Sequence, residues 1–163
     1  MKLANLAILA IMALLSTSPA HAEFMGPPYI PPKQVVYDVA YAEGFDADLL
    51  WAVAMTESSG CKKLFNVATR DYGCFQFNIK TIKALHLDLH RITYDHAYAA
   101  HQAISYIRNL QDQYKKRERL TYICRYNVGT GTLSGLRAKT CIKYANRIEH
   151  FRSKLNTILA EAP

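Results

Sequence analysis

The stretch DADLLWAVAMTESSG, residues 46–60, decides how the rest of the chain is interpreted. Asp46 is a good helix N-cap, because its side chain can accept a hydrogen bond from the free N–H groups of the first turn. The residues from Leu49 to Met55 are all apolar, which is typical of a short helix that is buried on every side. Gly60 is a natural C-terminal stop. The stretch therefore predicts a central, buried helix that ends at Thr56-Glu57-Ser58-Ser59-Gly60.

Helical and non-helical segments alternate around this central helix. Gln34 to Glu43 places its apolar residues at helical spacing, whereas Lys62 to Asn78 has no helical period and is rich in aromatic residues. The helical period returns after Asn78, after Asp95, from about Arg117 to Tyr126 and from Lys139 to Leu159. We therefore expect a single, mainly α domain over residues 34–163, of the α+β kind, with a small β-like or irregular insert.

The first 22 residues have the composition of a secretory signal peptide. They contain 15 apolar residues, and the apolar run from Leu3 to Leu15 is short of the roughly 20 residues that cross a bilayer. Ala20-His21-Ala22 matches a small-x-small cleavage site. An uncleaved anchor is the alternative interpretation. With a Pro-rich lead-in at residues 23–33, we expect an exported protein, periplasmic or extracellular, that has no stable membrane anchor.

Export changes the meaning of the basic charge and of the cysteines. A net charge of +7 would suggest nucleic acid for a cytoplasmic domain, but an exported one meets anionic wall polymers, so no nucleic-acid partner is expected. Solubility alone is the other explanation for the charge. The four cysteines can form disulfides and allow three pairings. We favour the local one, Cys61–Cys74 and Cys124–Cys141, because each bridge closes a loop of under 20 residues.

Glu57 is the first candidate for catalysis. It is the only acidic residue between Asp48 and Asp71, and it lies at the end of the helix predicted to be buried. Burial and the negative end of the helix dipole both favour the protonated carboxyl group and raise its pKa. A carboxylic acid that keeps its proton near neutral pH is what a general acid requires. The alternative is an acid at a frayed helix end that points into water.

Four short motifs follow one another along the chain, beginning at Glu57. They are Glu57-Ser58-Ser59-Gly60, Gly73-Cys74-Phe75-Gln76-Phe77-Asn78, Tyr126-Asn127-Val128-Gly129 and Tyr144-Ala145-Asn146-Arg147-Ile148. Together they resemble the lytic transglycosylases of the lysozyme superfamily, notably the small exported proteins that accompany secretion and conjugation machines. The resemblance covers about residues 34–155. It implies a lysozyme-like fold whose insert helps to form a glycan cleft, and an enzyme that cleaves peptidoglycan without a cofactor.

The resemblance also implies a role for each motif. Glu57 would protonate the oxygen of the β-1,4 bond between N-acetylmuramic acid and N-acetylglucosamine, and would then take the proton of the muramyl C6 hydroxyl as a 1,6-anhydro ring closes. One acid suffices because the sugar supplies its own nucleophile, unlike the two-carboxylate scheme of most glycosidases. Ser58 and Gln76 would line the cleft beside the scissile bond. Asn127 would hydrogen-bond the sugar or its N-acetyl group, and Tyr144 would help to position Glu57.

A second carboxylate leaves the outcome of the reaction open. The segment Asp71–Asn78 resembles the part of animal-type lysozymes whose aspartate is the second catalytic carboxylate. If Asp71 faces the cleft close to Glu57, a hydrolytic, lysozyme-type muramidase is the alternative, whereas an Asp71 that points to solvent or pairs with Arg70 leaves the one-acid route. We favour the transglycosylase because the third and fourth motifs match that branch. A non-catalytic peptidoglycan-binding assembly factor is the remaining alternative.

The expected partners are peptidoglycan glycan strands and, from the resemblance, components of an envelope-spanning secretion or conjugation machine. No metal is expected. His86 and His90 are four residues apart, but no glutamate completes a His-Glu-x-x-His pattern, so solvated helix surface is the simpler interpretation.

Overall fold

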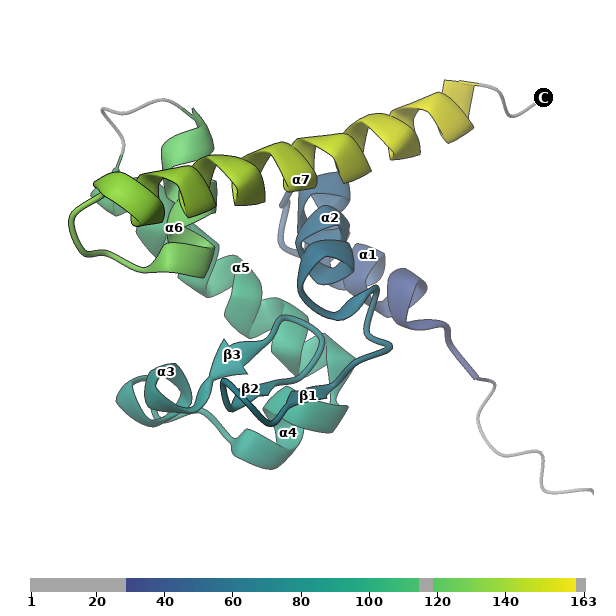
Figure 1. The fold of residues 1–163 in the computed structure, drawn as a ribbon. Coiled ribbons are helices and arrows are strands. Elements are labelled where there is room, and N and C mark those ends of the chain that lie inside the picture. Colours follow the sequence, from purple (N-terminus) through teal and green to yellow (C-terminus); the bar gives the residue numbers. More distant parts are fainter. Residues whose placement is uncertain (1–28, 115–118, 161–163) are drawn as a thin grey trace, which may run out of the picture.

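The computed structural model is mainly helical, with a small three-stranded sheet between the second and third helices (Figure 1). It describes residues 29–114 and 119–160, so the expected signal peptide and most of the Pro-rich lead-in lie outside the described residues. The helices are α1 (Pro32–Ala42), α2 (Ala47–Ser58), α3 (Ile79–Ala84), α4 (Leu89–Tyr94), α5 (His96–Gln113), α6 (Arg119–Val128) and α7 (Gly135–Ala160). The strands are β1 (Phe65–Asn66), β2 (Asp71–Tyr72) and β3 (Phe77–Asn78). The mainly α architecture with a small β insert agrees with the sequence prediction.

Helix α2 forms as predicted, from its cap and its apolar composition. The Asp46 carboxylate accepts a hydrogen bond of 2.9 Å from the Leu49 N–H, which satisfies one of the free donors of the first turn. Eight of its twelve residues are buried, so the helix is enclosed on most sides. Ser59 and Gly60 then take positive φ values of 58° and 70° and end it. Glu57 therefore lies in the last turn of a buried helix.

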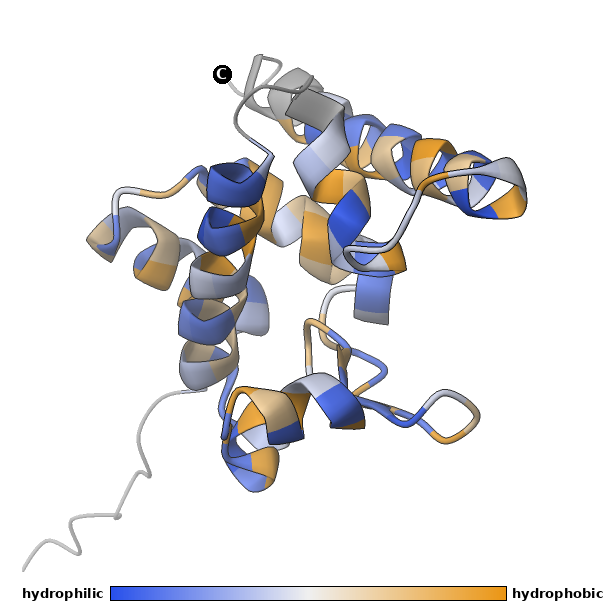
Figure 2. Cartoon of the chain, turned by 90° about the vertical axis from the view of Figure 1, so that its left-hand side faces the viewer, coloured by the Kyte–Doolittle hydropathy of each residue, from blue (hydrophilic) through white to orange (hydrophobic). Residues whose placement is uncertain are grey.

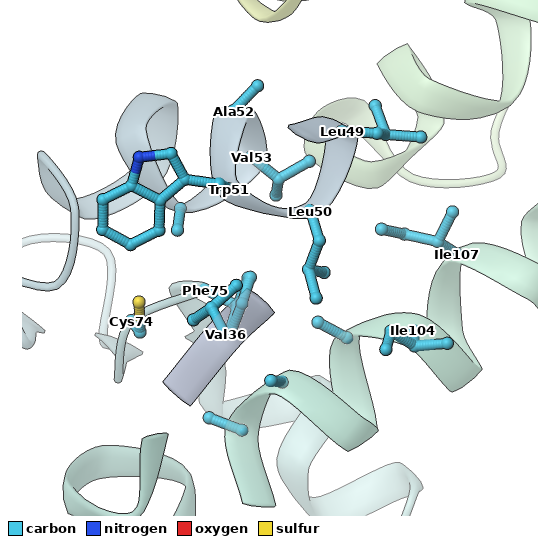
Figure 3. Close-up of a cluster of buried hydrophobic side chains, with 14 of the residues drawn as sticks. Val36, Leu49, Leu50, Trp51, Ala52, Val53, Cys74, Phe75, Ile104 and Ile107 are labelled. Carbon is cyan, nitrogen blue, oxygen red and sulfur yellow. The ribbon is translucent and has the colours of Figure 1, made fainter. Parts of the chain in front are cut away.

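The hydrophobic core surrounds α2. This helix packs against α1 and α7, while α5 packs against α1, α4 and α6. Figure 3 shows Leu50 of α2 between Val36 of α1 and the α5 residues Ile104 and Ile107, with Phe75 of the insert beside Val36. All five side chains are fully buried. Because each side chain of this size stabilises the fold by about 1.5–3 kcal/mol when buried, the core holds α2 firmly in place.

Most of the other helices have one buried and one solvent-facing side. Hydrophobic and hydrophilic residues both occur around their axes in Figure 2. Helix α5 starts where the sequence predicted it, because the Asp95 carboxylate caps it through the Tyr98 N–H at 2.9 Å. Two starts differ from the prediction: α1 begins at Pro32, inside the expected lead-in, and α7 begins at Gly135 instead of Lys139. None of the helices in the described part of the chain combines the length and apolarity needed to cross a membrane.

The insert is an antiparallel sheet fixed at several points. Strand β2 pairs with β1 and β3, and Asp71 lies opposite Asn78. Asn78 also caps α3, because its side-chain oxygen accepts a hydrogen bond of 3.0 Å from the Lys80 N–H. A disulfide between Cys61 and Cys74 ties the segment after α2 to the insert. The second disulfide joins Cys124 of α6 to Cys141 of α7, so the structure has the local pairing favoured from the sequence.

Candidate active site

A cleft of about 810 Å³ lies beside the end of α2. One wall comes from the insert and the start of α3, and the other from α5, the end of α6, the loop after it and the start of α7. Four of the residues predicted from the sequence line this cleft: Glu57, Asp71, Gln76 and Asn127. The volume lies in the upper part of the range of roughly 300–1,000 Å³ that is usual for ligand pockets.

Glu57 is held in the cleft by a tyrosine from the last helix. The Tyr144 hydroxyl donates a hydrogen bond of 2.6 Å to Glu57 Oε1. Tyr144 is only 7% exposed, because it lies on the face of α7 that packs against α2. The expected contact between the fourth motif and Glu57 is therefore present. A buried donor on one carboxylate oxygen fixes the orientation of the carboxyl group and leaves the other oxygen to the cleft.

The surroundings of Glu57 raise its pKa from 4.5 to about 7. Burial is the largest cause, because it removes water from the charged form. The hydrogen bond from Tyr144 opposes this effect by stabilising the carboxylate, the negative charge of Asp71 adds to it, and the positive charge of Arg147 lowers the pKa. At neutral pH the protonated and ionised forms of Glu57 are thus both well populated, which suits a group that gives a proton and then takes one.

Three aromatic residues form a cluster along the cleft. The ring of Tyr126 lies 5.4 Å from that of Tyr106 and 6.3 Å from that of Phe77, both edge to face. The Tyr126 hydroxyl donates a hydrogen bond of 3.0 Å to the carbonyl of Phe75, which joins α6 to the insert. Burial raises the pKa of Tyr126 well above its usual value, so the phenol keeps its proton. Rings in this position provide apolar surface against which sugar rings can pack.

Asp71 faces the cleft and is held there by neutral donors. Its Oδ1 accepts a hydrogen bond of 2.8 Å from Asn78 Nδ2, and its Oδ2 accepts one from the Thr69 hydroxyl. Among the ion pairs of the described residues, none joins Asp71 to Arg70. Of the two positions considered from the sequence, the structure has the one that keeps a second carboxylate in the cleft with Glu57.

Gln76 has its amide group fixed by the backbone. Its φ is +50°, and its Nε2 donates hydrogen bonds of 3.0 Å to the Lys63 carbonyl and 2.8 Å to the Gly73 carbonyl. Both amide hydrogens are therefore committed to the insert. What Gln76 can offer a ligand in the cleft is its carbonyl oxygen, which accepts hydrogen bonds from hydroxyl and amide groups.

The comparison with protein families agrees with this geometry. A family model described as the transglycosylase SLT domain matches residues 35–146. The chain belongs to this family. The match extends from α1 into α7 and includes the residues that form the cleft around Glu57. The searches of curated proteins and of solved structures returned no significant match.

Membership of this family defines the reaction that the protein catalyses in general terms. Members of the SLT family are lytic transglycosylases that act on peptidoglycan, so this chain is a peptidoglycan lytic transglycosylase with a lysozyme-like fold. Its two disulfides require an oxidising compartment. Together with the peptidoglycan substrate, they indicate an exported enzyme.

One predicted contact is wrong, because Ser58 does not line the cleft of this transglycosylase. The Ser58 side chain is 0% exposed. Its hydroxyl donates to the Cys74 carbonyl at 2.6 Å and accepts from the Cys61 N–H at 2.8 Å. Successive residues of a helix point about 100° apart, so Glu57 faces the cleft while Ser58 faces the insert. Ser58 fastens the insert to the end of α2, at the same place as the Cys61–Cys74 bridge.

Sequence reasoning missed some residues of the cleft. Tyr106, Lys80 and Arg137 all line it. Tyr106 follows Ile104 in the periodic part of α5, where nothing in the pattern separates a cleft-facing aromatic residue from a core one. In the part of the chain that the structure describes, no group of His, Cys, Asp and Glu residues is arranged to hold a metal ion.

We expect Tyr144→Phe to change the pH profile of the transglycosylase as well as its rate. The phenol stabilises the ionised form of Glu57, so its removal should raise the pKa of Glu57 above about 7. Activity that needs protonated Glu57 falls as the pH rises through this pKa. The fall should therefore occur at a higher pH in the variant, together with a roughly tenfold lower kcat from looser positioning.

Rates of muropeptide release measured from pH 5 to 9 test this prediction. Tyr122→Phe is a suitable control, because Tyr122 is a partly buried tyrosine that does not line the cleft. A Tyr144→Phe profile that fell at the same pH as the wild-type profile would show that the phenol has only a packing role.

Proposed function

We propose that the enzyme cleaves the β-1,4 bond between N-acetylmuramic acid and N-acetylglucosamine without water and leaves 1,6-anhydromuramyl ends. The observation that carries the proposal is Glu57 itself, a carboxyl group with a pKa of about 7 in the glycan cleft, oriented by the 2.6 Å hydrogen bond from Tyr144. Such a group can act as acid and as base at one pH.

Each step of this reaction balances with Glu57 as the only proton carrier. Protonated Glu57 gives its proton to the glycosidic oxygen as the bond to muramyl C1 breaks, and N-acetylglucosamine leaves with a free hydroxyl group. The muramyl C6 oxygen then bonds to C1, and its proton passes to the Glu57 carboxylate. The enzyme returns to its protonated state, and no water is consumed. In this proposal Asn127 and Gln76 bind the sugar, and Tyr144 positions Glu57.

Hydrolysis is the second candidate, and the position of Asp71 favours it. Asp71 lines the same cleft as Glu57, and its charge acts on the pKa of Glu57. In retaining glycosidases a second carboxylate near the acid becomes the nucleophile. In our proposal Asp71 instead stabilises the positive charge that develops on the sugar ring. The hydrogen bonds that Asp71 accepts from Thr69 and Asn78 hold its carboxylate in place for this role.

Mass analysis of the released muropeptides separates these mechanisms. We expect anhydromuramyl ends from the wild-type enzyme and from Asp71→Asn, with the variant about ten- to a hundredfold slower because one stabilising charge is lost. Hydrolysis would give reducing ends, heavier by one water, and Asp71→Asn would then release almost nothing. A wall-binding assembly factor would release nothing from the intact wild-type protein.

We also propose that the enzyme opens the wall locally in the periplasm for an envelope-spanning secretion or conjugation machine. Support comes from the resemblance to small exported transglycosylases of such machines and from a net charge of +7, which suits contact with anionic wall polymer. Cell fractionation with an assay of secretion or conjugation in a deletion strain tests this role. Unchanged transfer in that strain, or protein found only in the cytoplasm, would contradict it.

A further inference from the structure

Arg137 brings a positive charge to the wall of the cleft formed by α7 and the loop after α6. It lies in the first turn of α7 and lines the cleft together with Asn127 and Gly129. The guanidinium group donates a hydrogen bond to the Val128 carbonyl. It also lies directly over Gly131, where a Cβ atom would come within 3.0 Å of the guanidinium carbon. Because Gly131 has no side chain, the loop leaves room for the guanidinium group of Arg137.

A second arginine, on α6, holds the backbone of the same loop. Arg125 of α6 is only 5% exposed, and it donates hydrogen bonds to the carbonyls of Gly129, at 3.2 Å, and Gly131. Its guanidinium group lies 4.8 Å from the centre of the Tyr114 ring. The loop is therefore held by a buried arginine on one side, while Arg137 occupies the side that faces the cleft. The two arginines have different roles, because only Arg137 is exposed to a ligand.

Arg137 has no acidic partner among the residues that the structure describes. The arginines Arg91, Arg108 and Arg152 each form an ion pair with an aspartate or glutamate, but none of the ion pairs includes Arg137. Its bond to the Val128 carbonyl uses one of five N–H donors. A planar guanidinium group with several remaining donors matches the two oxygens of a carboxylate.

We propose that Arg137 binds a carboxylate that the glycan strand carries on its muramyl residues. This inference rests on the proposed substrate, because the sugar rings of that strand are neutral and its carboxylates belong to the substituents of muramic acid. Two sources have the same chemistry: the stem peptide, and the lactyl carboxylate that becomes free when an amidase removes the peptide. Arg137 is therefore a specificity residue, which selects glycan strands by their charge and takes no part in proton transfer.

The test compares Arg137→Ala with wild type on two forms of the same glycan strands. One form keeps its carboxylates, and in the other they are converted to neutral methylamides. We expect Arg137→Ala to lower kcat/KM about tenfold more on the charged strands than on the neutral ones, since a charge-assisted hydrogen bond contributes only when both partners are present. A smaller loss shared by both forms would come from the hydrogen bond between Arg137 and the Val128 carbonyl. Wild type should lose about the same factor when its substrate is neutralised. Arg137→Lys should recover part of the loss.

Lys139→Ala is the matched control, because Lys139 is an exposed cation on the same helix that does not line the cleft. It should behave as wild type on both substrates. An equal loss for Arg137→Ala on charged and neutral strands would show that Arg137 only holds the loop, and no loss on either would show that it does not contact the substrate. Both outcomes overturn the inference.

The source of the carboxylate follows from repeating the comparison on amidase-treated strands. A charge-dependent loss on peptide-bearing strands assigns the stem peptide, and one confined to amidase-treated strands assigns the lactyl group. Failure of the proposed function looks different from failure of this inference. In the first case wild type releases no anhydromuramyl product, and in the second it does so while Arg137→Ala fails to distinguish the two forms.

Discussion

A Glu57→Gln variant is expected to lose at least about 10³-fold in the rate of peptidoglycan cleavage and to keep its fold. The amide has nearly the same shape as the carboxyl group and can still accept the hydrogen bond from Tyr144, but it can neither give nor take the proton. General acid–base catalysis contributes typically 10²–10⁴-fold, and both proton transfers of the proposed reaction use this residue. Muropeptide release measures the loss of activity, and circular dichroism of the purified protein shows whether the fold is kept.

The same variant should be more stable than wild type, but only at high pH. The pKa of Glu57 is about 7 in the folded chain and 4.5 without the surrounding protein, so folding favours the protonated form. The contribution of Glu57 to stability is therefore fully present below about pH 4.5 and is lost as the pH rises through about 7. This difference corresponds to a free energy of about 3 kcal/mol at pH 8.

Thermal unfolding at two pH values checks the sign of this effect. We expect the Tm of Glu57→Gln to exceed that of wild type by several degrees at pH 8 and to equal it near pH 4. Glu149→Gln is a control with the opposite sign, because Glu149 is an acid of α7 outside the cleft whose carboxylate pairs with Arg152 at 3.4 Å. Its removal should not raise the Tm at pH 8. Equal differences in Tm at both pH values would contradict the conclusion that burial raises the pKa of Glu57. A Glu57→Gln enzyme that clears walls at the wild-type rate would exclude Glu57 as the catalytic acid.

The sequence predicted the features that depend on local composition. Asp46 and Asp95 begin their helices because a carboxylate caps a helix wherever three N–H groups follow it in the correct geometry. The apolar run after Asp46 specified a buried helix, and the position of Glu57 at its end specified a desolvated acid. The disulfide pairing also followed from short loops. In each case the sequence signal that carries the prediction lies within about 20 residues.

Features that depend on tertiary packing could not be predicted in the same way. The motif containing Glu57 and Ser58 does not reveal that the two side chains point in different directions, because that depends on where the insert lies. Helix α4 has only six residues, too few for a helical period to stand out. Arg137 lies outside every motif and reaches the cleft only because α7 begins at Gly135, at the end of the loop that Arg125 holds.

The last predicted effect concerns Gly73, which joins the insert to α4. Gly73 has a φ of +77°, and a Cβ atom at this position would lie 1.9 Å from the carbonyl oxygen of Ile92. That oxygen belongs to the backbone of α4, so it cannot move without the helix. Gly73 also donates a hydrogen bond of 2.8 Å to the Leu64 carbonyl, which prevents the insert from moving away freely. Gly73→Ala should therefore destabilise the fold by at least about 3 kcal/mol, the sum of left-handed strain and a severe clash.

Gly44→Ala separates the two causes of this loss. Gly44 has a similar φ of +60°, but its Cβ atom would meet nothing within 4 Å. Gly44→Ala should therefore lower the free energy of unfolding by only about 1–2 kcal/mol, the penalty of an L residue in the left-handed region. Urea unfolding of both variants measures the difference, and cleavage rates show whether the displaced insert, which carries Asp71 and Gln76, also lowers activity. If the two variants lost equal stability, the contact between the insert and α4 would not be the tight one that positions this wall of the cleft.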